Sequence, residues 1–446
     1  MQYSRCYLLV FAAKEGRRNH KACRPFHPEK TASFVVSADK QIYHCFGCGA
    51  GGNALTFVMQ YEKVNFREAL ESLAQRSGIP LPEPEKTDFQ RSKEDFSRNL
   101  LSLYEKTAEF YHANLMNSQE AGPARNYLQK RGISKETAKN FRLGFAKSGW
   151  DTLIQHLRTQ NLTLNQIEKS GIVVAKDDGG YYDRFRNRII FPIVNIKDKV
   201  IAFGARVLDN SLPKYINSPE TAIYVKGKNL FGLNLAKDSI RSLDQVIVVE
   251  GYLDMIIPYE AGIKNIVASL GTALTEEQIK LLKRFTNNVV MLYDADLAGE
   301  MATLRALDLL IKEDMRVRIA SLPKGEDPDS FARKNGKDAF LKMIDSAKPI
   351  FDYKFDLLVA RYGADSIISK ENIVREILPT VKKFQTSTMR SEYIKRIAQV
   401  LLLDETALWE DFKNAKEDEY ENESSDNTAI TNYRLSEIPI TERMLV

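Results

Sequence analysis

The chain contains few cysteines, few tryptophans and no long apolar run. Among its 446 residues there are four cysteines and two tryptophans, and the formal net charge is only +5. No apolar stretch approaches the roughly 20 residues of a membrane-spanning helix, and the short apolar run 7–13 lacks a signal-peptide cleavage site. We therefore expect a cytoplasmic protein of about three domains that does not bind a membrane. Since the net charge is mild, only local charge clusters can indicate a polyanionic ligand.

Three of the four cysteines cluster with histidines. Cys23 and His27 precede the pair Cys45-x-x-Cys48, and this spacing is typical of a tetrahedral zinc site. The residues between them alternate like the two strands of a hairpin, which predicts a zinc ribbon that needs one structural Zn²⁺ to fold. Metal ligation rather than disulfide formation suits a reducing cytosol. His44 is a competing ligand, but its neighbour Cys45 is better placed.

Aromatic and basic residues accompany the predicted ribbon. Phe34, Tyr43 and Phe46 alternate along its strands, near Lys30 and Lys40. The rings can stack on unpaired bases while the lysines meet phosphates. Alternatively, the rings pack a small core. The sequence supports these two interpretations about equally.

Helical segments and a linker follow the ribbon. The apolar spacing in 53–78 predicts two amphipathic helices, and the proline-rich run 80–86 predicts an interdomain linker. A further helical stretch is expected from about 88 to 131. The residues beyond 329, up to about 416, are helical in pattern throughout. The acidic run 417–426 predicts a disordered linker.

Basic residues dominate the segment 184–228. It holds nine Lys or Arg residues against three acids, Asp198, Asp209 and Glu220. Aromatic residues such as Tyr181, Tyr182, Phe185 and Tyr215 are interleaved with these cations. A solvated basic face is the default explanation, but apolar strands flank the charges and an acidic region follows. The segment therefore predicts contacts to a nucleic-acid template and to triphosphates.

Four β-rich apolar runs alternate with helix-like segments in 244–329. The runs are 245–249, 265–269, 288–293 and 317–321, and this alternation predicts a parallel sheet. Carboxylates follow three of the runs, and ligands gather at the carboxyl ends of strands in such sheets. The acids are Glu250, Asp254, Asp294, Asp296, Asp327 and Asp329.

Six acids at one sheet edge repel one another unless cations neutralise them. Carboxylate ligands suit Mg²⁺ or Mn²⁺, and a pair of such ions promotes in-line nucleotidyl transfer. The alternative is that the acids are helix N-caps and turn residues, the usual fate of a single Asp after a strand. Three acidic clusters after successive strands favour the metal site.

The acidic motifs carry a family resemblance. E-G-Y-L-D at 250–254, Y-D-A-D-L-A-G at 293–299 and G-E-D-P-D at 325–329 resemble the toprim signatures of bacterial replicative DNA primase of the DnaG type. Toprim domains also occur in topoisomerases, small nucleases and recombination proteins, so the flanking sequence must decide.

The flanking motifs also resemble primase, in matching order from about 21 to 337. They are P-F-H-P-E-K-T-A-S-F, Y-H-C-F-G-C-G-A-G-G-N-A, D-R-F-R-N-R, F-G-A-R-V-L, K-Y-I-N-S-P-E-T and K-G-K-N-L-F-G-L. The resemblance implies template and nucleotide contacts at Arg131, Arg184, Arg186, Arg206, Lys214, Asn217 and Lys226. It also implies single-stranded DNA and ribonucleoside triphosphates as ligands, and a replicative helicase as partner.

One position departs from the family pattern. The family has Cys directly before Pro-Phe-His, where this chain has Arg24. Either Cys23 takes the place of that ligand, or the site keeps only His27, Cys45 and Cys48 and binds zinc weakly.

The predicted fold is multidomain α/β, with a zinc ribbon, a basic mixed subdomain, a toprim parallel sheet and a helical bundle. The expected domains are a zinc ribbon in 1–80, a linker in 81–90, the basic N-terminal subdomain of a catalytic core in 91–240, a toprim domain in 241–330, a helical bundle in 331–416, and an acidic linker with the start of a missing helicase-binding domain in 417–446.

The resemblance implies an enzyme that synthesises short RNA primers on single-stranded DNA. Glu250, Asp294 and Asp296 are the expected catalytic acids, and Glu250 is the best candidate proton acceptor if one is needed. Two other functions stay open: a toprim nuclease or topoisomerase, and a non-catalytic nucleic-acid binder. Incorporation of ribonucleotides, as opposed to cleavage or mere binding of DNA, separates the three.

Overall fold

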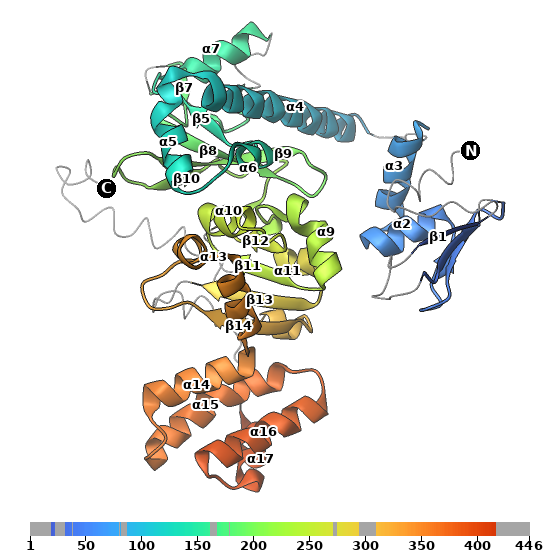
Figure 1. Ribbon diagram of the computed structural model, residues 1–446, viewed down its shortest axis with the longest axis vertical. Helices are drawn as coiled ribbons and strands as arrows, with labels where there is room; N and C mark the ends of the chain where they lie inside the picture. Colours follow the sequence, from blue (N-terminus) through green and yellow to red (C-terminus); the bar gives the residue numbers. More distant parts are fainter. Residues whose placement is uncertain are drawn as a thin grey trace. The chain divides into compact units, whose positions relative to one another are not determined.

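The computed structural model divides the chain into two units, residues 1–349 and 350–446, shown in Figure 1. It describes residues 19–22, 32–37, 39–79, 81, 87–160, 167–177, 179–270, 274–293 and 309–415. Across those stretches, no helix is both long and apolar enough to cross a bilayer.

The N-terminal module is a small antiparallel sheet with two helices. Its strands pair in the order β1-β2-β3-β4, and Phe34 lies opposite Cys45 in the register. Phe34, Tyr43 and Phe57 pack together as its core, which confirms the predicted ribbon hairpin and helices. The elements are β1 (Asn19–Ala22), β2 (Phe34–Ser37), β3 (Ile42–Cys45), β4 (Gly51–Gly52), α2 (Ala54–Glu62) and α3 (Phe66–Ser77).

The basic subdomain places a long helix against an antiparallel sheet. The sheet order is β10-β9-β8-β5, and β6 and β7 form a separate ribbon. Tyr104 and Tyr111 on α4 pack edge-on against Phe203 of β9. The elements are α4 (Asp88–Asn117), η1 (Gln119–Ala121), α5 (Gly122–Lys130), α6 (Lys135–Asn140), β5 (Gly144–Ala146), α7 (Thr152–Thr159), β6 (Val173–Ala175), β7 (Tyr181–Asp183), β8 (Arg188–Val194), β9 (Val200–Val207), β10 (Tyr215–Asn217) and η2 (Lys226–Lys228).

The next segment forms the predicted parallel sheet. Its order is β12-β11-β13-β14-β15, and the first four strands are parallel whereas β15 is antiparallel. The strand β11 is buried along its whole length because helices cover both faces, as in other parallel sheets. The elements are α9 (Leu233–Leu243), β11 (Val246–Val249), α10 (Tyr252–Glu260), β12 (Ile266–Ala268), α11 (Glu276–Lys283), β13 (Asn288–Tyr293), β14 (Arg316–Ser321), α13 (Pro328–Asp345) and β15 (Lys348–Pro349).

The basic subdomain and the parallel sheet share one hydrophobic core. Tyr252, at the start of α10, stacks on Phe191 of β8 with ring centroids 4.8 Å apart. The ring of Tyr252 also leaves no room for a Cβ at Gly204 on β9. The glycine of the F-G-A-R motif therefore lets α10, the helix that follows β11, lie directly on the antiparallel sheet. This packing positions the basic strands beside the acidic sheet edge.

The second unit is entirely helical where the structure describes it, as the apolar pattern predicts. Each helix packs on the next one in sequence. In addition, Phe351 of α14 stacks on Tyr393 of α16. The helices are α14 (Ile350–Tyr362), α15 (Ile367–Lys383), α16 (Ser387–Leu401) and α17 (Glu405–Asn414). The predicted multidomain α/β fold is thus confirmed.

Candidate active site and template-binding surface

Two of the predicted metal-binding acids lie at the carboxyl end of β11. Glu250 directly follows the strand, and Asp254 lies in the first turn of α10. The Asp254 carboxylate bends back over Gly251, because a Cβ at that glycine would lie 2.5 Å from Asp254 Oδ2. Both acids are half-buried. The turn between strand and helix therefore brings the two carboxylates to one sheet edge.

The motif G-E-D-P-D forms the start of α13. Asp327 is the N-cap, and its Oδ1 accepts a 2.7 Å hydrogen bond from the Ser330 amide. Pro328 occupies the first turn, where its missing N–H has no intrahelical partner to lose. Asp329 is buried, and its carboxylate accepts from Arg131 and, at 2.6 Å, from Arg333. One acid of this motif caps the helix and the other holds two arginines.

Asp327 stays ionised at neutral pH. Burial raises the pKa of its carboxyl, but the hydrogen bonds from Ser330 and the charges of Arg131 and Arg333 outweigh burial. The net pKa lies below the ordinary value for Asp. Its remaining lone pairs can accept from a further ligand at this edge.

A buried arginine lies beside the acidic edge. Arg206 on β9 is 8% exposed, and its guanidinium lies 4.4 Å from the Tyr127 ring centroid and 5.5 Å from that of Tyr215. Its Nε is buried and has no hydrogen-bond partner. The pKa of Tyr215 is raised to about 12, mainly by burial. The charge of Arg206 lowers this pKa, and the charge of Asp254 raises it further. The cation and the acids therefore belong to one electrostatic environment.

Arg206, Tyr127 and Arg131 form a cationic track that ends at Asp329. Tyr127 also lies under the guanidinium of Arg131, at 5.3 Å from its ring centroid. Arg131 in turn pairs with Asp329. Two cations stacked on the face of one ring are attracted by its quadrupole while they keep their donors free for acceptors. Arg206, Tyr127 and Arg131 connect β9 to the start of α13.

Asn217, Lys214 and Lys226 lie on the strand and loop that follow β9. Asn217 Oδ1 accepts from the Tyr252 hydroxyl at 2.8 Å, so its side chain joins β10 to α10. Lys214 is exposed. Burial lowers the pKa of Lys226, although the Glu220 charge acts in the opposite direction. The backbone of η2 is held by Gln278 of α11, whose amide nitrogen donates to the Lys226 carbonyl at 3.3 Å.

Arg184 and Arg186 lie on the turn after β7. Arg184 Nε donates to the Gly171 carbonyl at 2.5 Å, so this side chain supports its own turn. The Arg186 guanidinium lies 4.2 Å from the Trp150 ring centroid and 4.9 Å from that of Tyr182. The Trp150 side chain is 60% exposed. Trp150, Arg186 and Tyr182 are called the Trp150 stack below. The Tyr182 ring lies edge-on to the exposed indole, with centroids 5.5 Å apart.

The remaining predicted acids lie outside the described residues. Asp294 and Asp296 follow β13, whose last residue is Tyr293. In the stretches that the structure describes, no three His, Cys, Asp or Glu residues form a metal-binding group. The donor set at this edge nevertheless fits Mg²⁺ or Mn²⁺, since Glu250 and Asp254 supply only carboxylate oxygens.

The structure describes two of the four predicted zinc ligands, Cys45 and Cys48. Cys45 is buried, with its Sγ 3.3 Å from Ser33 Oγ, and Cys48 is exposed three residues later. The turn between them is closed by a 2.8 Å hydrogen bond from the Gly49 amide to the Cys45 carbonyl. Two sulfur ligands on such a turn suit Zn²⁺. Cys23 and His27 lie outside the described residues.

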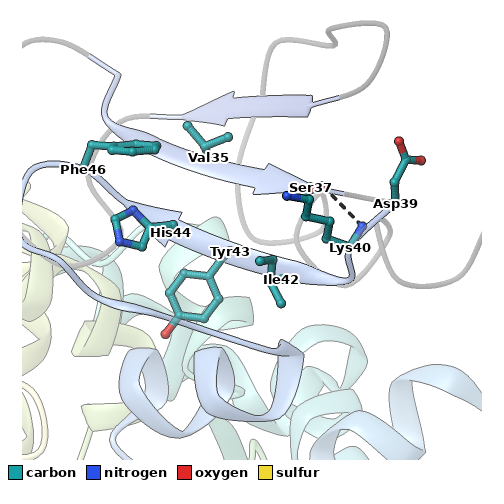
Figure 2. Close-up of a pocket in the computed structure, with 8 residues that line it drawn as sticks. All are labelled: Val35, Ser37, Asp39, Lys40, Ile42, Tyr43, His44 and Phe46. Carbon is teal, nitrogen blue, oxygen red and sulfur yellow. Dashed lines mark hydrogen bonds between the residues drawn. The ribbon is translucent and has the colours of Figure 1, made fainter.

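The ribbon separates its aromatic residues between two faces. Phe34 and Tyr43 are each 1% exposed and pack in the core, so the stacking interpretation is wrong for these two rings. Phe46 is 73% exposed and lies edge-on against His44, with centroids 4.7 Å apart. These two residues and Lys40 line a cavity of about 350 Å³ on the outer face of the hairpin (Figure 2).

Three residues of these surfaces were not predicted. Trp150, Tyr127 and Arg333 gave no signal of their own, because a single aromatic or basic residue in a helical or loop pattern is usually structural. Tyr127 lies four residues before Arg131 on the face of α5, so the helical period relates the two. Only the tertiary packing of β9, which carries Arg206, shows that the Tyr127 ring contacts the guanidinium groups of two arginines.

Models of four families match successive parts of the chain. They are the CHC2 zinc finger in 9–89, the N-terminal domain of the DNA primase catalytic core in 110–237, a toprim-like domain in 247–332 and the DnaB-helicase binding domain of primase in 351–406. The expectation that the helicase-binding domain is missing is therefore wrong. Its match covers α14–α16, which the apolar pattern had identified only as a bundle.

Relatives and solved structures agree with these models. The DNA primase of Clostridium acetobutylicum is 42% identical over 89% of this chain, which spans 65% of that relative. The DNA primase of Pasteurella multocida is 40% identical over 89% of this chain and is covered to 68%. The chain thus spans about two thirds of the length of these two relatives. It belongs to the bacterial DNA primase family, of the DnaG type.

Two solved structures match large parts of the chain. The zinc-binding and RNA polymerase domains of Aquifex aeolicus primase are 32% identical, with a TM-score of 0.62, over 92% of this chain and 96% of that chain. A DnaG primase catalytic domain bound to single-stranded DNA is 36% identical, with a TM-score of 0.63, over 69% of this chain and 99% of that one.

Proposed function

We propose that the chain is a DNA primase that synthesises short RNA primers on single-stranded DNA. The observation that carries this proposal is the position of Arg206 and Tyr215 beside Asp254, where a cationic track meets a carboxylate edge. Nucleotidyl transfer needs this combination, since both the template and the triphosphate are polyanions. The sequence family of the chain and the single-stranded DNA in a related catalytic domain support it.

The carboxylates at the edge would hold the catalytic ions. Glu250, Asp254, Asp294 and Asp296 are the proposed ligands of Mg²⁺ or Mn²⁺, and Asp327 and Asp329 border the site. When bound, such ions lower the pKa of the attacking 3′-hydroxyl and neutralise charge on the α-phosphate and the departing pyrophosphate. Glu250 is the residue we propose to accept the proton if a protein group does so.

The protein side chains would supply positioning. The Arg206 guanidinium is held between the Tyr127 and Tyr215 rings, and we propose that it donates to a phosphate oxygen of the bound nucleotide or template. Arg131 already pairs with Asp329, which fixes its guanidinium on the Tyr127 ring. Ions and reactants held in line convert a bimolecular reaction into an effectively unimolecular one.

The zinc ribbon would present the template. Phe46 and His44 on its outer face give adjacent exposed rings, and Lys40 borders the same cavity. Aromatic rings beside a cation bind unpaired bases without strict sequence readout. Selection of an initiation site would then depend on this face rather than on the buried Phe34 and Tyr43.

The helical unit would bind a replicative helicase. Its match to the DnaB-helicase binding domain covers 351–406, and Ile367, Ile368 and Leu402 expose 86%, 71% and 84% of their surfaces. We propose that the partner buries these side chains, because removing apolar surface from water favours association. Helicase binding would bring the polymerising core to newly unwound template.

Primer synthesis is tested by supplying single-stranded DNA, labelled ribonucleotides and Mg²⁺. We expect short labelled RNA that appears only with template, and we expect a chelator to reduce the rate to background because the carboxylates alone cannot stabilise the developing charge. The products are resolved on a denaturing gel, with the DNA strand labelled separately. Cleaved DNA without RNA would instead indicate a toprim nuclease or topoisomerase, and DNA binding with neither product would indicate a non-catalytic binder.

The first zinc ligand is tested by Cys23→Ser. We propose Cys23, His27, Cys45 and Cys48 as the ligands, so the variant is expected to lose most of its zinc because three protein ligands hold a structural ion weakly. Zinc per chain is measured by elemental analysis after dialysis against a mild chelator. Cys6→Ser removes the one cysteine outside the cluster and is the matched control. Full zinc retention by Cys23→Ser would exclude Cys23 as a ligand.

A further inference from the structure

A buried acid outside the predicted site joins two segments of the basic subdomain. Asp183 is the last residue of β7 and is 2% exposed. Its Oδ2 accepts from the Leu153 amide at 2.7 Å, and its Oδ1 accepts from the Ile154 amide at 3.1 Å. These amides belong to the first turn of α7, where backbone donors lack intrahelical partners.

Asp183 therefore replaces the usual N-cap side chain of α7. Asp151 occupies the N-cap position, but it makes no side-chain cap hydrogen bond. The acid that caps this helix instead comes from a strand 30 residues away in sequence. A remote cap fixes the start of α7 relative to β7, which a local cap cannot do.

The backbone of Asp183 holds both ends of the Trp150 stack. Its amide donates to the Trp150 carbonyl at 2.7 Å, and its carbonyl accepts from Arg186 Nη1 at 2.5 Å. Trp150 and Arg186 lie 4.2 Å apart, ring centroid to guanidinium carbon. Four hydrogen bonds to one residue thus connect the exposed indole, its cation and the start of α7.

We propose that Asp183 is a positioning residue for the DNA template. Its carboxylate caps α7 and so fixes the position of Asp183, whose backbone holds the Trp150 stack in the arrangement that receives an unpaired base. Template affinity then depends on the carboxylate accepting from both amides of α7. This inference rests on the proposed function of the chain as a primase. Asp183 itself is buried and does not contact the template.

The charge environment supports a dependence on pH in the physiological range. The pKa of Asp183 is raised to about 6, mainly by burial and also by the charge of Asp151. The hydrogen bonds from the Leu153 and Ile154 amides and the charge of Arg186 lower the pKa but do not cancel this effect. From α4, the Tyr111 hydroxyl lies in the field of Asp183 and is buried without a hydrogen-bond partner. An ionised carboxylate accepts from both amides of α7, whereas a protonated one carries a hydrogen with no acceptor among them. Ionisation above about pH 6 therefore orders the turn.

The test uses the full chain with Trp409→Phe, which leaves Trp150 as the only tryptophan. An oligothymidylate is the probe, and binding is measured by quenching of Trp150 fluorescence and independently by anisotropy of a labelled oligonucleotide. We expect Asp183→Asn to weaken binding about fivefold to tenfold, at the low end for loss of one base stack. The template KM should rise by a similar factor while kcat at saturating template changes less than about threefold.

Asp177→Asn is the matched control, because it removes one acid from an exposed position in the same region. A double variant adds Trp150→Ala. If Asp183 acts through the stack, Asp183→Asn has almost no further effect on anisotropy in that background. An equal loss with and without Trp150 would overturn the proposal, as would unchanged binding by a folded Asp183→Asn variant.

The pH dependence of binding is measured on the protein with an intact Asp183, so this test does not require the Asp183→Asn variant to fold. Binding of oligothymidylate is expected to weaken about threefold from pH 7.5 to pH 5.5, as the carboxyl becomes protonated. General electrostatics predicts the opposite trend, because lower pH makes the protein more positive. Binding that is unchanged or stronger at pH 5.5 contradicts the proposal. These arms measure DNA binding alone, so they remain distinct from a failure to synthesise primers.

Discussion

Asp294→Asn is expected to lower the rate of primer synthesis at least about a thousandfold while DNA binding changes little. The substitution keeps the shape of the side chain but removes a negative charge from the proposed metal site. Loss of one electrostatic contact to the transition state costs about a hundredfold to a thousandfold, and loss of a metal ion costs more. The initial rate of labelled ribonucleotide incorporation is measured at saturating template and Mg²⁺.

Asp345→Asn is the matched control for that experiment. Asp345 is an exposed acid at the end of α13, and its replacement is expected to leave the rate within about twofold of the parent, as for most surface substitutions. Template affinity of both variants is measured by anisotropy. Normal priming by Asp294→Asn would exclude Asp294 as a catalytic metal ligand, whereas loss of DNA binding would indicate a structural role.

Asp329→Ala is expected to lower the local free energy of unfolding at the start of α13 by about 3 kcal/mol. Removing a buried partner leaves Arg131 and Arg333 without their shared acceptor. The value lies at the low end for a broken buried ion pair, because both arginine side chains keep partial access to water, 26% and 38% respectively. Hydrogen exchange of the α13 amides, recorded with a chelator present, measures this change without any contribution from bound metal.

Asp327→Ala gives the comparison for that measurement. It removes only the N-cap of the same helix, for which about 1 kcal/mol is typical. The two variants change neighbouring acids of one motif, so they separate helix capping from the ion-pair network. An Asp329→Ala effect no larger than that of Asp327→Ala would show that the two arginines contribute little to local stability.

The strands of the parallel sheet could be predicted almost residue by residue. The runs 245–249, 265–269, 288–293 and 317–321 correspond to β11, β12, β13 and β14 within one or two residues. Strands buried on both faces need a continuous apolar run, which leaves a clear local signal. The antiparallel strand β15 gave no such signal, since it contains only Lys348 and Pro349.

The ribbon aromatics show where a local pattern is insufficient. Phe34, Tyr43 and Phe46 all lie near one hairpin, but only Phe46 is exposed. Alternation predicts that neighbours on a strand face opposite sides, and it does not say which side the helices α2 and α3 cover. That choice depends on packing between elements.

The amino-acid sequence by itself determined the order of elements, the acidic motifs after the strands and the cysteine pair, because each depends on residues close together in the chain. Only the tertiary structure decided which polar groups are already engaged. Asp329 pairs with Arg131, 198 residues away, and Asp183 caps a helix that begins 31 residues earlier, at Thr152. Such pairs form because burying a charge or an amide without a partner is costly. No local period encodes which partner the folded chain supplies.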